Sequence, residues 1–219
     1  MIKFIKGNIF NSKCQTLVNT VNCQGVMGKG IALEFSYRFP DMVKKYKKLC
    51  EENKITIGRL WVYKAKDIWV LNFPTKNDWK QPSKLEYLDK GLKNFVTNYK
   101  KEGIKSIAFP QLGSGNGELA WQEVSKLMES YLSGLGIPIE FYIYDSNAED
   151  VLYKSFLKRT KDFTIIDLKV ELKLKEKQAT LLFDAVRKET ITNFANLRNI
   201  KGLGKGTISR LYLFAKGNE

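Results

Sequence analysis

Histidine is absent from this chain of 219 residues, and cysteine occurs only three times. Without histidine, the chain can form neither a serine–histidine–aspartate triad nor a Cys/His zinc site. The three cysteines, Cys14, Cys23 and Cys50, show no paired spacing. An odd number of cysteines without an export signal predicts reduced thiols rather than disulfides.

Long apolar runs are also missing. No segment approaches the ~20 consecutive apolar residues that a membrane-spanning helix requires. The first ten residues, MIKFIKGNIF, lack the long apolar stretch of a secretory signal. We therefore expect a cytoplasmic protein with no membrane partner.

Lysine, by contrast, is abundant, and 37 basic residues against 23 acidic ones give a formal net charge of +14. A basic surface attracts nucleic acid, anionic lipid or phosphorylated ligands. A lysine-rich proteome in the source organism would produce the same excess, so the charge alone does not distinguish a polyanion partner from a general bias. Residues 161–219 contain 12 basic and 7 acidic side chains, so part of the excess lies in this region.

Strand and helix signals alternate over most of the chain, as in α/β proteins. Strands are predicted at residues 1–6, 16–21, 59–63, 68–72, 106–109 and 139–144, and helices at 29–37, 40–52, 83–101, 118–133 and 148–159. Ser83 is predicted to cap its helix, with Glu86 completing a capping box.

From about residue 161 the alternation of strands and helices ends. The pattern then predicts a charged helix at 173–187 and an apolar helical hairpin at 196–216. No internal repeat is visible in the sequence. We therefore predict two domains, an α/β domain at 1–158 and a basic helical domain at 162–219.

The most informative segment is LVNTVNCQGVMGKGIAL, residues 17–33. An apolar strand ends in Asn22, and three glycines then lead to an apolar helix start. Such a turn lets backbone N–H groups approach a phosphate. A Rossmann loop would need an acidic residue ~20 positions later, where the chain has lysines at 44–48, and a Walker A loop would need Ser or Thr after Gly-Lys. The segment therefore predicts either a nucleotide-type ligand with a sugar near Asn22 or a plain turn.

A second glycine loop, PQLGSGNG at residues 110–117, also follows a strand and precedes a helix. Two such loops at the carboxyl edge of one sheet can hold a diphosphate from both sides. A third strand ends in NFPTK, where Pro74 stiffens the turn and Thr75 and Lys76 follow it. Lys76 alone would be an ordinary exposed lysine, but its strand end is expected to face both loops.

Together these motifs resemble the macrodomain family, the ADP-ribose-binding fold. The resemblance rests on Gly7-Asn8-Ile9, VNTVNCQGVMGKGIA, PQLGSGNGELAW and NFPTKNDWKQPS, and it covers about residues 1–155. The last segment is similar to the DarG-type antitoxin macrodomains, which remove ADP-ribose from thymidine bases in DNA. The resemblance implies an α/β fold, a three-layer α/β/α macrodomain with a mixed central sheet, to which this chain adds a small C-terminal helical domain.

By this resemblance, Lys76 is the catalytic residue. As a neutral amine it could attack the anomeric carbon, or its open-chain aldehyde, and form a covalent adduct that water resolves. Lys80 or Lys84 would favour the neutral amine through like-charge repulsion, which lowers the pKa of an ammonium. As a cation, Lys76 would instead stabilise the departing base. The family resemblance implies no metal and no cofactor.

The resemblance also assigns the ADP-ribose contacts. Asn8 and Ile9 are expected at the adenine end and Asn22 at the distal ribose. The other expected contacts are Gly25, Met27, Gly28, Lys29, Gly30 and Ile31 in the first loop, Thr75 before the lysine, and Gly113, Ser114, Gly115, Asn116 and Gly117 in the second loop.

The chain departs from the family pattern at several positions. Asn8 stands where many macrodomains carry Asp, and Ser114 where cysteine is frequent. Relatives often carry histidine near Asp78, which here is either a base or a solvated side chain. The glutamate-directed relative has a catalytic aspartate at the position of Gly117, so this glycine favours the DNA-base branch over protein esters.

DNA contacts are expected in two places. Trp79 follows the Lys76 turn, where a flipped or single-stranded base could stack on its ring. The segment IKGLGKGT, residues 200–207, resembles a helix–hairpin–helix motif, whose glycines expose N–H groups to a phosphate. An ordinary helical hairpin with a glycine cap is the alternative. The expected DNA-binding residues of this segment are Lys201, Gly202, Gly204, Lys205 and Arg210.

The sequence thus predicts a monomeric hydrolase that removes ADP-ribose from a nucleobase in DNA, with thymidine favoured. Its expected partners are ADP-ribosylated DNA and a cognate DNA ADP-ribosyltransferase toxin. Two alternatives remain, a non-catalytic ADP-ribose reader and a hydrolase of a guanosine, RNA-end or protein-glutamate linkage.

Overall fold

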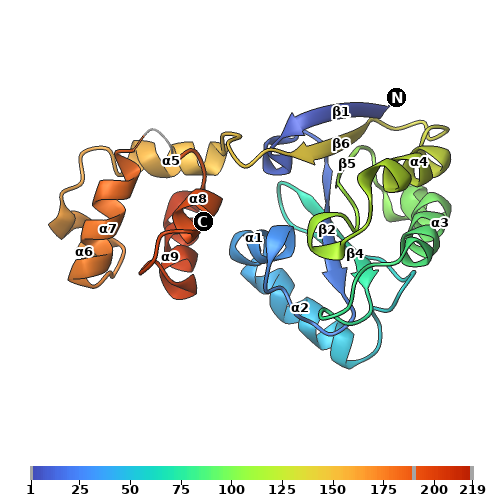
Figure 1. Cartoon of the computed structure of the whole chain (residues 1–219), viewed down its shortest axis with the longest axis horizontal. Helices are drawn as coiled ribbons and strands as arrows, with labels where there is room; N and C mark the ends of the chain where they lie inside the picture. The colour runs from blue at the N-terminus through green and yellow to red at the C-terminus, as the bar shows by residue number, and fades with distance from the viewer. Residues whose placement is uncertain (1, 189–190, 218–219) are drawn as a thin grey trace. The chain divides into compact units, whose positions relative to one another are not determined.

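The computed structural model describes residues 2–188 and 191–217 (Figure 1). Internal contacts divide the chain into two compact units, residues 1–144 and 145–219. The junction that we expected after residue 158 therefore lies inside the second unit. None of the described helices combines the length and hydropathy that a bilayer span requires.

The first unit contains one six-stranded sheet in the order β1-β6-β5-β2-β4-β3. The strands, in chain order, are β1 (Ile2–Gly7), β2 (Thr16–Asn22), β3 (Trp61–Lys64), β4 (Trp69–Lys76), β5 (Ile107–Pro110) and β6 (Ile139–Tyr144). All neighbouring strands are parallel except β3, which pairs antiparallel with β4. The predicted mixed sheet is confirmed.

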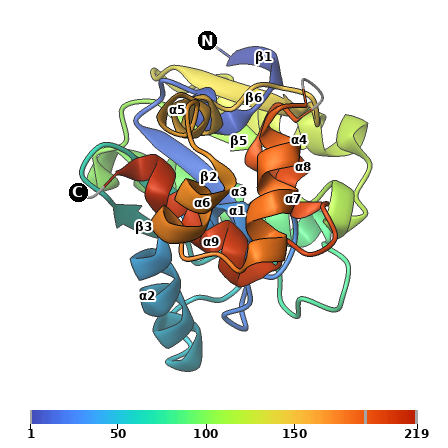
Figure 2. The ribbon, with the colours of Figure 1, turned by 90° about the vertical axis from the view of Figure 1, so that its left-hand side faces the viewer.

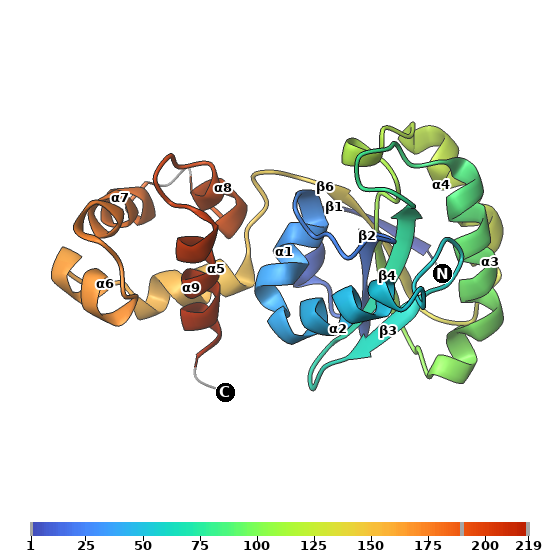
Figure 3. The same cartoon turned by 90° about the horizontal axis from the view of Figure 1, so that it is seen from below.

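Helices cover both faces of the sheet (Figure 3). Alternate residues of a strand point to opposite faces, so neighbouring apolar residues enter two different cores. Leu17 joins the core beneath α1 (Gly30–Arg38) and α2 (Pro40–Glu51), while Val18 joins the core beneath α3 (Leu85–Glu102) and α4 (Trp121–Leu132). This arrangement confirms the predicted three-layer fold.

Close packing fixes α3 against β4, the strand that ends in Lys76. A Cβ at Gly91 of α3 would lie 2.2 Å from the Phe73 ring of β4, so only glycine allows this approach. The helix ends at Gly103, whose φ of +82° is the left-handed conformation common after helices.

Three local predictions in this unit were wrong. Pro74 does not lie in a turn, because β4 continues through it to Lys76. Ser83 does not cap α3, because Lys84 occupies the N-cap position and the Ser83 N–H donates to the Gly117 carbonyl at 3.0 Å. Glu86 instead pairs with Lys90 at 2.5 Å. α4 begins at Trp121 rather than at Glu118, since a 3₁₀ turn, η2 (Gly115–Gly117), precedes it.

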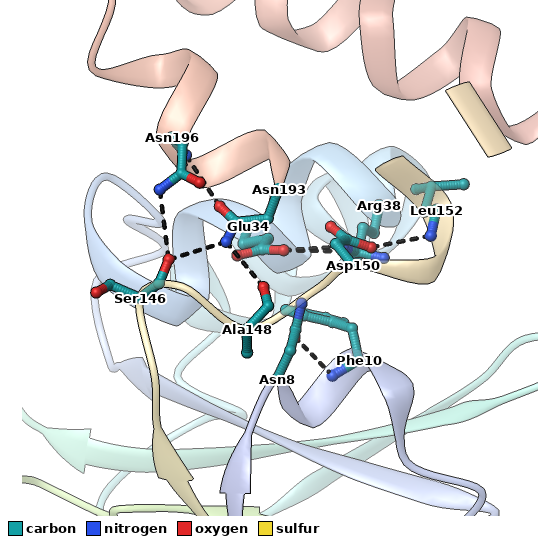
Figure 4. A network of polar contacts seen from close by, with 10 residues as sticks. All are labelled: Asn8, Phe10, Glu34, Arg38, Ser146, Ala148, Asp150, Leu152, Asn193 and Asn196. Atoms are coloured by element: carbon teal, nitrogen blue, oxygen red, sulfur yellow. Dashed lines mark hydrogen bonds and ion pairs between the residues drawn. The ribbon is translucent and has the colours of Figure 1, made fainter. Parts of the chain in front are cut away.

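The second unit consists of short helices (Figure 2). They are α5 (Val151–Arg159), α6 (Ile165–Glu171), α7 (Glu176–Val186), α8 (Phe194–Arg198) and α9 (Lys205–Lys216). Aromatic rings of Tyr153, Phe156, Phe194 and Tyr212 are buried in this unit. The Asn193 side chain donates to the carbonyl oxygens of Ser146 and Ala148 at 2.9 and 3.0 Å (Figure 4). The predicted helix at 173–187 starts only at Glu176, and α6 was not predicted.

Candidate active site

Three chain segments meet at the carboxyl edge of the sheet. β5, β2 and β4 are parallel neighbours, so the segments that follow them emerge at one edge. The first glycine loop, residues 23–29, follows β2, and the second, residues 111–120, follows β5. Lys76 is the last residue of β4. The topology therefore brings together the three motifs that the sequence analysis identified.

Lys76 touches both loops. Its Nζ donates to the backbone carbonyl of Asn116, in the second loop, at 2.7 Å. In the first loop, the Cys23 N–H donates to the Asn77 carbonyl at 3.2 Å, and the Cys23 thiol donates to the Lys76 carbonyl at 3.5 Å. Lys76 has no ion-pair partner among the described residues. It is therefore a half-buried amine without an acidic partner in the described part of the chain, and it lies between two glycine loops.

The Asn22 side chain shapes the first loop. Its Oδ1 accepts from the N–H groups of Gln24 and Val26 at 2.9 and 3.3 Å, and its Nδ2 donates to the Val26 carbonyl at 2.6 Å. The Tyr46 hydroxyl donates to the Asn22 carbonyl at 2.6 Å. A buried amide bonded in this way holds the loop backbone in place. Its expected contact with a ribose stays a prediction.

Tyr46 is a site residue that the sequence analysis missed. It lies on α2 and is fully buried, and burial raises the pKa of its phenol. Met42, Tyr46 and Cys50 recur every four residues on a lysine-rich helix. This spacing marks the buried face of α2 and could have predicted that Tyr46 supports the loop.

Cys23 does not have the properties of a nucleophile. Burial raises the pKa of its thiol to about 11, so the thiol stays protonated at neutral pH. Among the described residues, no group of three or more Cys, Asp and Glu side chains is placed to hold a metal ion. Of the side chains around the two loops, Lys76 is therefore the strongest candidate for chemistry.

Glycine is required where the two loops approach each other. Gly30 has a φ of +56°, and a Cβ there would lie 2.7 Å from the side-chain nitrogen of Asn116. Asn116 thus contacts Lys76 through its carbonyl and approaches the start of α1 through its side chain. In the second loop, Gly113 and Gly115 also have positive φ values, of +64° and +61°.

Ser83 lies beneath the second loop. A Cβ at Gly117 would lie 2.5 Å from the Ser83 hydroxyl oxygen, so the backbone of Gly117 rests directly on this side chain. The hydroxyls of Ser83 and Ser114 are both buried without a hydrogen-bond partner among the described residues. Sequence reasoning placed Ser83 at a helix cap and therefore missed this role.

Asn8 and Ile9 lie at the same edge, after β1 and several strands away from Lys76. The Asn8 side chain accepts from the Phe10 N–H at 3.0 Å (Figure 4). Ile9 is buried. β6, β5 and β2 separate β1 from β4, so a ligand that touched both ends of this row would have to be elongated.

The other predicted ligand residues lie along this edge. Met27 and Thr75 are buried, Gly28 and Ile31 are half-buried, and Lys29 is exposed at the N-cap of α1. Gly25 has a φ of +77° and packs against Lys47. Their contacts with ADP-ribose stay predictions.

Trp79 lies three residues after Lys76, within the turn that follows β4, and is 46% exposed. Its ring faces the Lys80 ammonium at 5.4 Å. The Asp78 carboxylate accepts from the Lys80 N–H at 2.9 Å, which closes a local turn. The position of Trp79 is compatible with base stacking.

A cavity of about 280 Å³ lies elsewhere in the first unit. It is lined by side chains that include Lys54, Arg59 and Tyr99. None of the predicted site residues lines this cavity, so it belongs to a different part of the surface from the glycine loops.

Comparison with known proteins identifies the family. The Macro domain model matches residues 18–128. A DNA ADP-ribosyl glycohydrolase of Thermus aquaticus is 38% identical over 186 residues, which are 83% of this chain and 49% of the relative. The chain therefore spans about half the length of that relative.

Solved structures agree with this assignment. The macrodomain of Mycobacterium tuberculosis DarG is 41% identical with a TM-score of 0.63, and the match covers 65% of this chain and 97% of that one. DarTG of Thermosipho africanus in complex with ADP-ribose is 39% identical with a TM-score of 0.61, and the match covers 68% of this chain and 43% of that one. The chain belongs to the macrodomain family.

Proposed function

We propose that this chain is a glycohydrolase that removes ADP-ribose from a nucleobase in DNA, with thymidine as the favoured base. The observation that carries the proposal is the position of Lys76, whose Nζ lies 2.7 Å from the Asn116 carbonyl between the two glycine loops. The relative from T. aquaticus is a DNA ADP-ribosyl glycohydrolase, and the T. africanus structure contains ADP-ribose. Both support the same substrate class for this chain.

In this proposal the loops hold the substrate and do not catalyse its cleavage. Backbone N–H groups at residues 25–31 and 113–117 bind the diphosphate, because glycines leave them accessible and α1 begins beside them. Asn8 and Ile9 contact the adenine end. Asn22 lies at the distal ribose and holds the first loop in shape. The anomeric carbon then lies near the end of β4.

Lys76 acts on the anomeric carbon in one of two ways. As a nucleophile, its neutral amine forms a bond to that carbon while the bond to the base breaks and the base takes up a proton. Water then displaces the lysine and releases ADP-ribose. As a cation, Lys76 stabilises negative charge on the departing base while water attacks directly. Reduction with borohydride separates the two, because the covalent adduct is a glycosylamine whose sugar ring can open to an imine, and borohydride reduces this imine to a stable modification of Lys76. The cationic route forms no adduct for borohydride to reduce.

The substrate class is tested with a panel of linkages. The purified chain is incubated with ADP-ribose attached to a thymidine oligonucleotide, a guanosine oligonucleotide, an RNA end or a protein glutamate. We expect the fastest release of ADP-ribose from the thymidine oligonucleotide. Faster release from another linkage would overturn the proposed base, and no release from any linkage would favour a non-catalytic reader.

A partner follows from the same chemistry. A fusion protein of T. africanus carries both a DNA ADP-ribosyl transferase and a DNA ADP-ribosyl glycohydrolase, and it is 39% identical to this chain over 161 residues. We propose that a DNA ADP-ribosyltransferase toxin supplies the substrate of this chain. Expression of such a transferase should arrest cells unless this chain is expressed with it, and Lys76→Ala should remove the protection.

A further inference from the structure

Helices α6 to α9 form two equivalent halves that are offset by 29 residues. α7 begins at Glu176 and α9 at Lys205. The helices before them are capped in the same way, because the side chains of Thr164 and Asn193 each accept from an N–H three residues later. This repeat lies in the structure and is not visible in the sequence.

The turns of the two halves also match. The residue two before the N-cap of the second helix has a positive φ in both halves, +50° at Lys173 and +106° at Gly202. Next to these residues, Leu174 and Leu203 are both buried. One turn later, the N–H groups of Ala179 and Ile208 donate to the N-cap carbonyls, each at 3.0 Å. The repeat therefore lies in caps, backbone angles and buried positions rather than in residue identities.

The halves meet through equivalent residues. Gln178 donates from Nε2 to the Thr207 hydroxyl at 2.9 Å, and these residues occupy the same position in α7 and α9. A residue that contacts its own counterpart lies near an approximate two-fold axis. The first turns of α7 and α9 are therefore side by side.

The charge of the two halves differs sharply. The first half, residues 164–186, has four basic and four acidic side chains, and Lys169 pairs with Glu176 at 2.7 Å. The second half, residues 193–215, has four basic side chains and no acidic one. The four are Arg198, Lys201, Lys205 and Arg210. Since the same fold forms with no net charge, the fold does not require the charge of the second half.

These four side chains have no hydrogen-bond or ion-pair partner within residues 2–188 and 191–217. Lys201 and Lys205 are exposed and form no ion pair among the described residues. A guanidinium nitrogen of Arg198 and one of Arg210 are buried without a hydrogen-bond partner in the described part of the chain. Lys201 and Lys205 are therefore the two cations of this half that an anionic ligand from outside the chain can reach.

The glycines of the second turn leave its backbone uncovered. A Cβ at Gly204 or Gly206 would meet nothing within 4 Å, so packing does not demand glycine at either position. The equivalent residues of the first half are Lys175 and Lys177, so the turn forms with side chains there. Gly202 is different, because a Cβ there would lie 2.7 Å from the Leu181 side chain.

We propose that the second hairpin, residues 200–206, binds the phosphate backbone of duplex DNA, with Lys201 and Lys205 as the main cations and the first half as its scaffold. The bare N–H groups near Gly204 supply further donors to phosphate oxygens. A duplex fits better than a single strand, because none of the described aromatic side chains at 145–217 is exposed for base stacking. This inference rests on the proposed function and extends it, because the hairpin would bind the ADP-ribosylated DNA through its backbone, independently of base sequence.

The test measures binding of the full chain to an unmodified, fluorescein-labelled DNA duplex by anisotropy over a series of salt concentrations. Lys201→Gln with Lys205→Gln should weaken binding about tenfold or more and reduce the slope of log K against log salt by about 1.8. The matched control is Lys173→Gln with Lys177→Gln, which removes the same charge from the neutral half. We expect less than about a twofold change for this control.

A second variant tests the turn without removing a cation. Gly204→Glu places a carboxylate where the first half carries Lys175, so the fold should be kept and DNA binding lost. Circular dichroism checks the fold. Equal weakening by the lysine pair and its control, or full binding by Gly204→Glu, would overturn the proposal. The proposal would also be overturned if Lys201→Gln with Lys205→Gln lost binding to phosphatidylglycerol vesicles but kept its binding to the duplex. Tighter binding of a single strand than of the duplex would overturn it as well.

The result is separable from the proposed catalytic function. The duplex carries no ADP-ribose, so Lys76→Ala should bind it as tightly as the original chain. If Lys76→Ala keeps its turnover while Lys201→Gln with Lys205→Gln loses DNA binding, the catalytic proposal fails and the hairpin proposal stands.

Discussion

Gly117 has no space for a side chain, which predicts a defined cost for Gly117→Ala. The added Cβ would lie 2.5 Å from the Ser83 hydroxyl oxygen and 3.1 Å from its Cβ. Ser83 is only 4% exposed, so its side chain cannot relieve the clash by moving into solvent. An ordinary contact of 3.4 Å to the hydroxyl would require a shift of 0.9 Å. An extra methyl group in a packed interior costs roughly 1–3 kcal/mol.

In the full chain, tryptophan fluorescence can measure this cost for the first unit separately from the second. All four tryptophans, Trp61, Trp69, Trp79 and Trp121, belong to it, so fluorescence in urea reports its unfolding. We expect Gly117→Ala to lower the free energy of unfolding by about 1–3 kcal/mol. Turnover should fall as well, because a shift of residue 117 displaces the neighbouring carbonyl that accepts from Lys76.

Ser83→Ala provides the control. It removes a hydroxyl that has no hydrogen-bond partner among the described residues, so alone it should change stability little. In its background Gly117→Ala should cost less, with a coupling energy of about 0.5–3 kcal/mol. Additive effects of the two substitutions would refute the direct contact between Gly117 and Ser83.

Three further predictions concern the loops and the substrate. Tyr46→Phe removes the bond to the Asn22 carbonyl and should cost about 0.5–1.5 kcal/mol in urea unfolding, with weaker ADP-ribose binding in calorimetry. Burial raises the pKa of Cys23 from 9.0 to about 11, so the unfolded chain loses this proton first and the free energy of unfolding should fall as pH rises from 9 to 11. Cys23→Ala should flatten this fall in urea titrations at several pH values, and an unchanged slope would contradict the assignment. Trp79→Ala should raise KM for a modified DNA strand about fivefold or more but leave KM for the modified mononucleotide unchanged, and equal effects on both substrates would remove the stacking role.

The sequence was sufficient to predict most of the first unit. The run from Leu17 to Asn22 predicted a strand, and the glycines after it predicted a turn at the carboxyl edge, because glycine directly after an apolar strand favours a tight turn into the next helix. Lys76 could be placed beside both loops because parallel strands end at one edge. The structure confirms each of these placements.

What could not be predicted depends on contacts between distant residues. Ser83 matches a helix cap locally, but its N–H pairs with Gly117, 34 residues away, and no local pattern encodes that bond. The repeat in the second unit was missed for a related reason. Lys173 and Gly202 share a positive φ but not a residue type, so equivalence is visible only in the backbone.

The central claim, that Lys76 performs the chemistry and the glycine loops hold the substrate, is tested most directly by single-turnover kinetics. When the enzyme is in saturating excess over an ADP-ribosylated thymidine oligonucleotide, all of the substrate is bound, and the observed rate of ADP-ribose release reports the cleavage step. Lys76→Ala should release ADP-ribose at least about a hundredfold more slowly, while Lys93→Ala, at an exposed lysine of α3, stays within about threefold of the original chain. A Lys76→Ala chain that binds ADP-ribose normally and cleaves at the original rate would contradict the account.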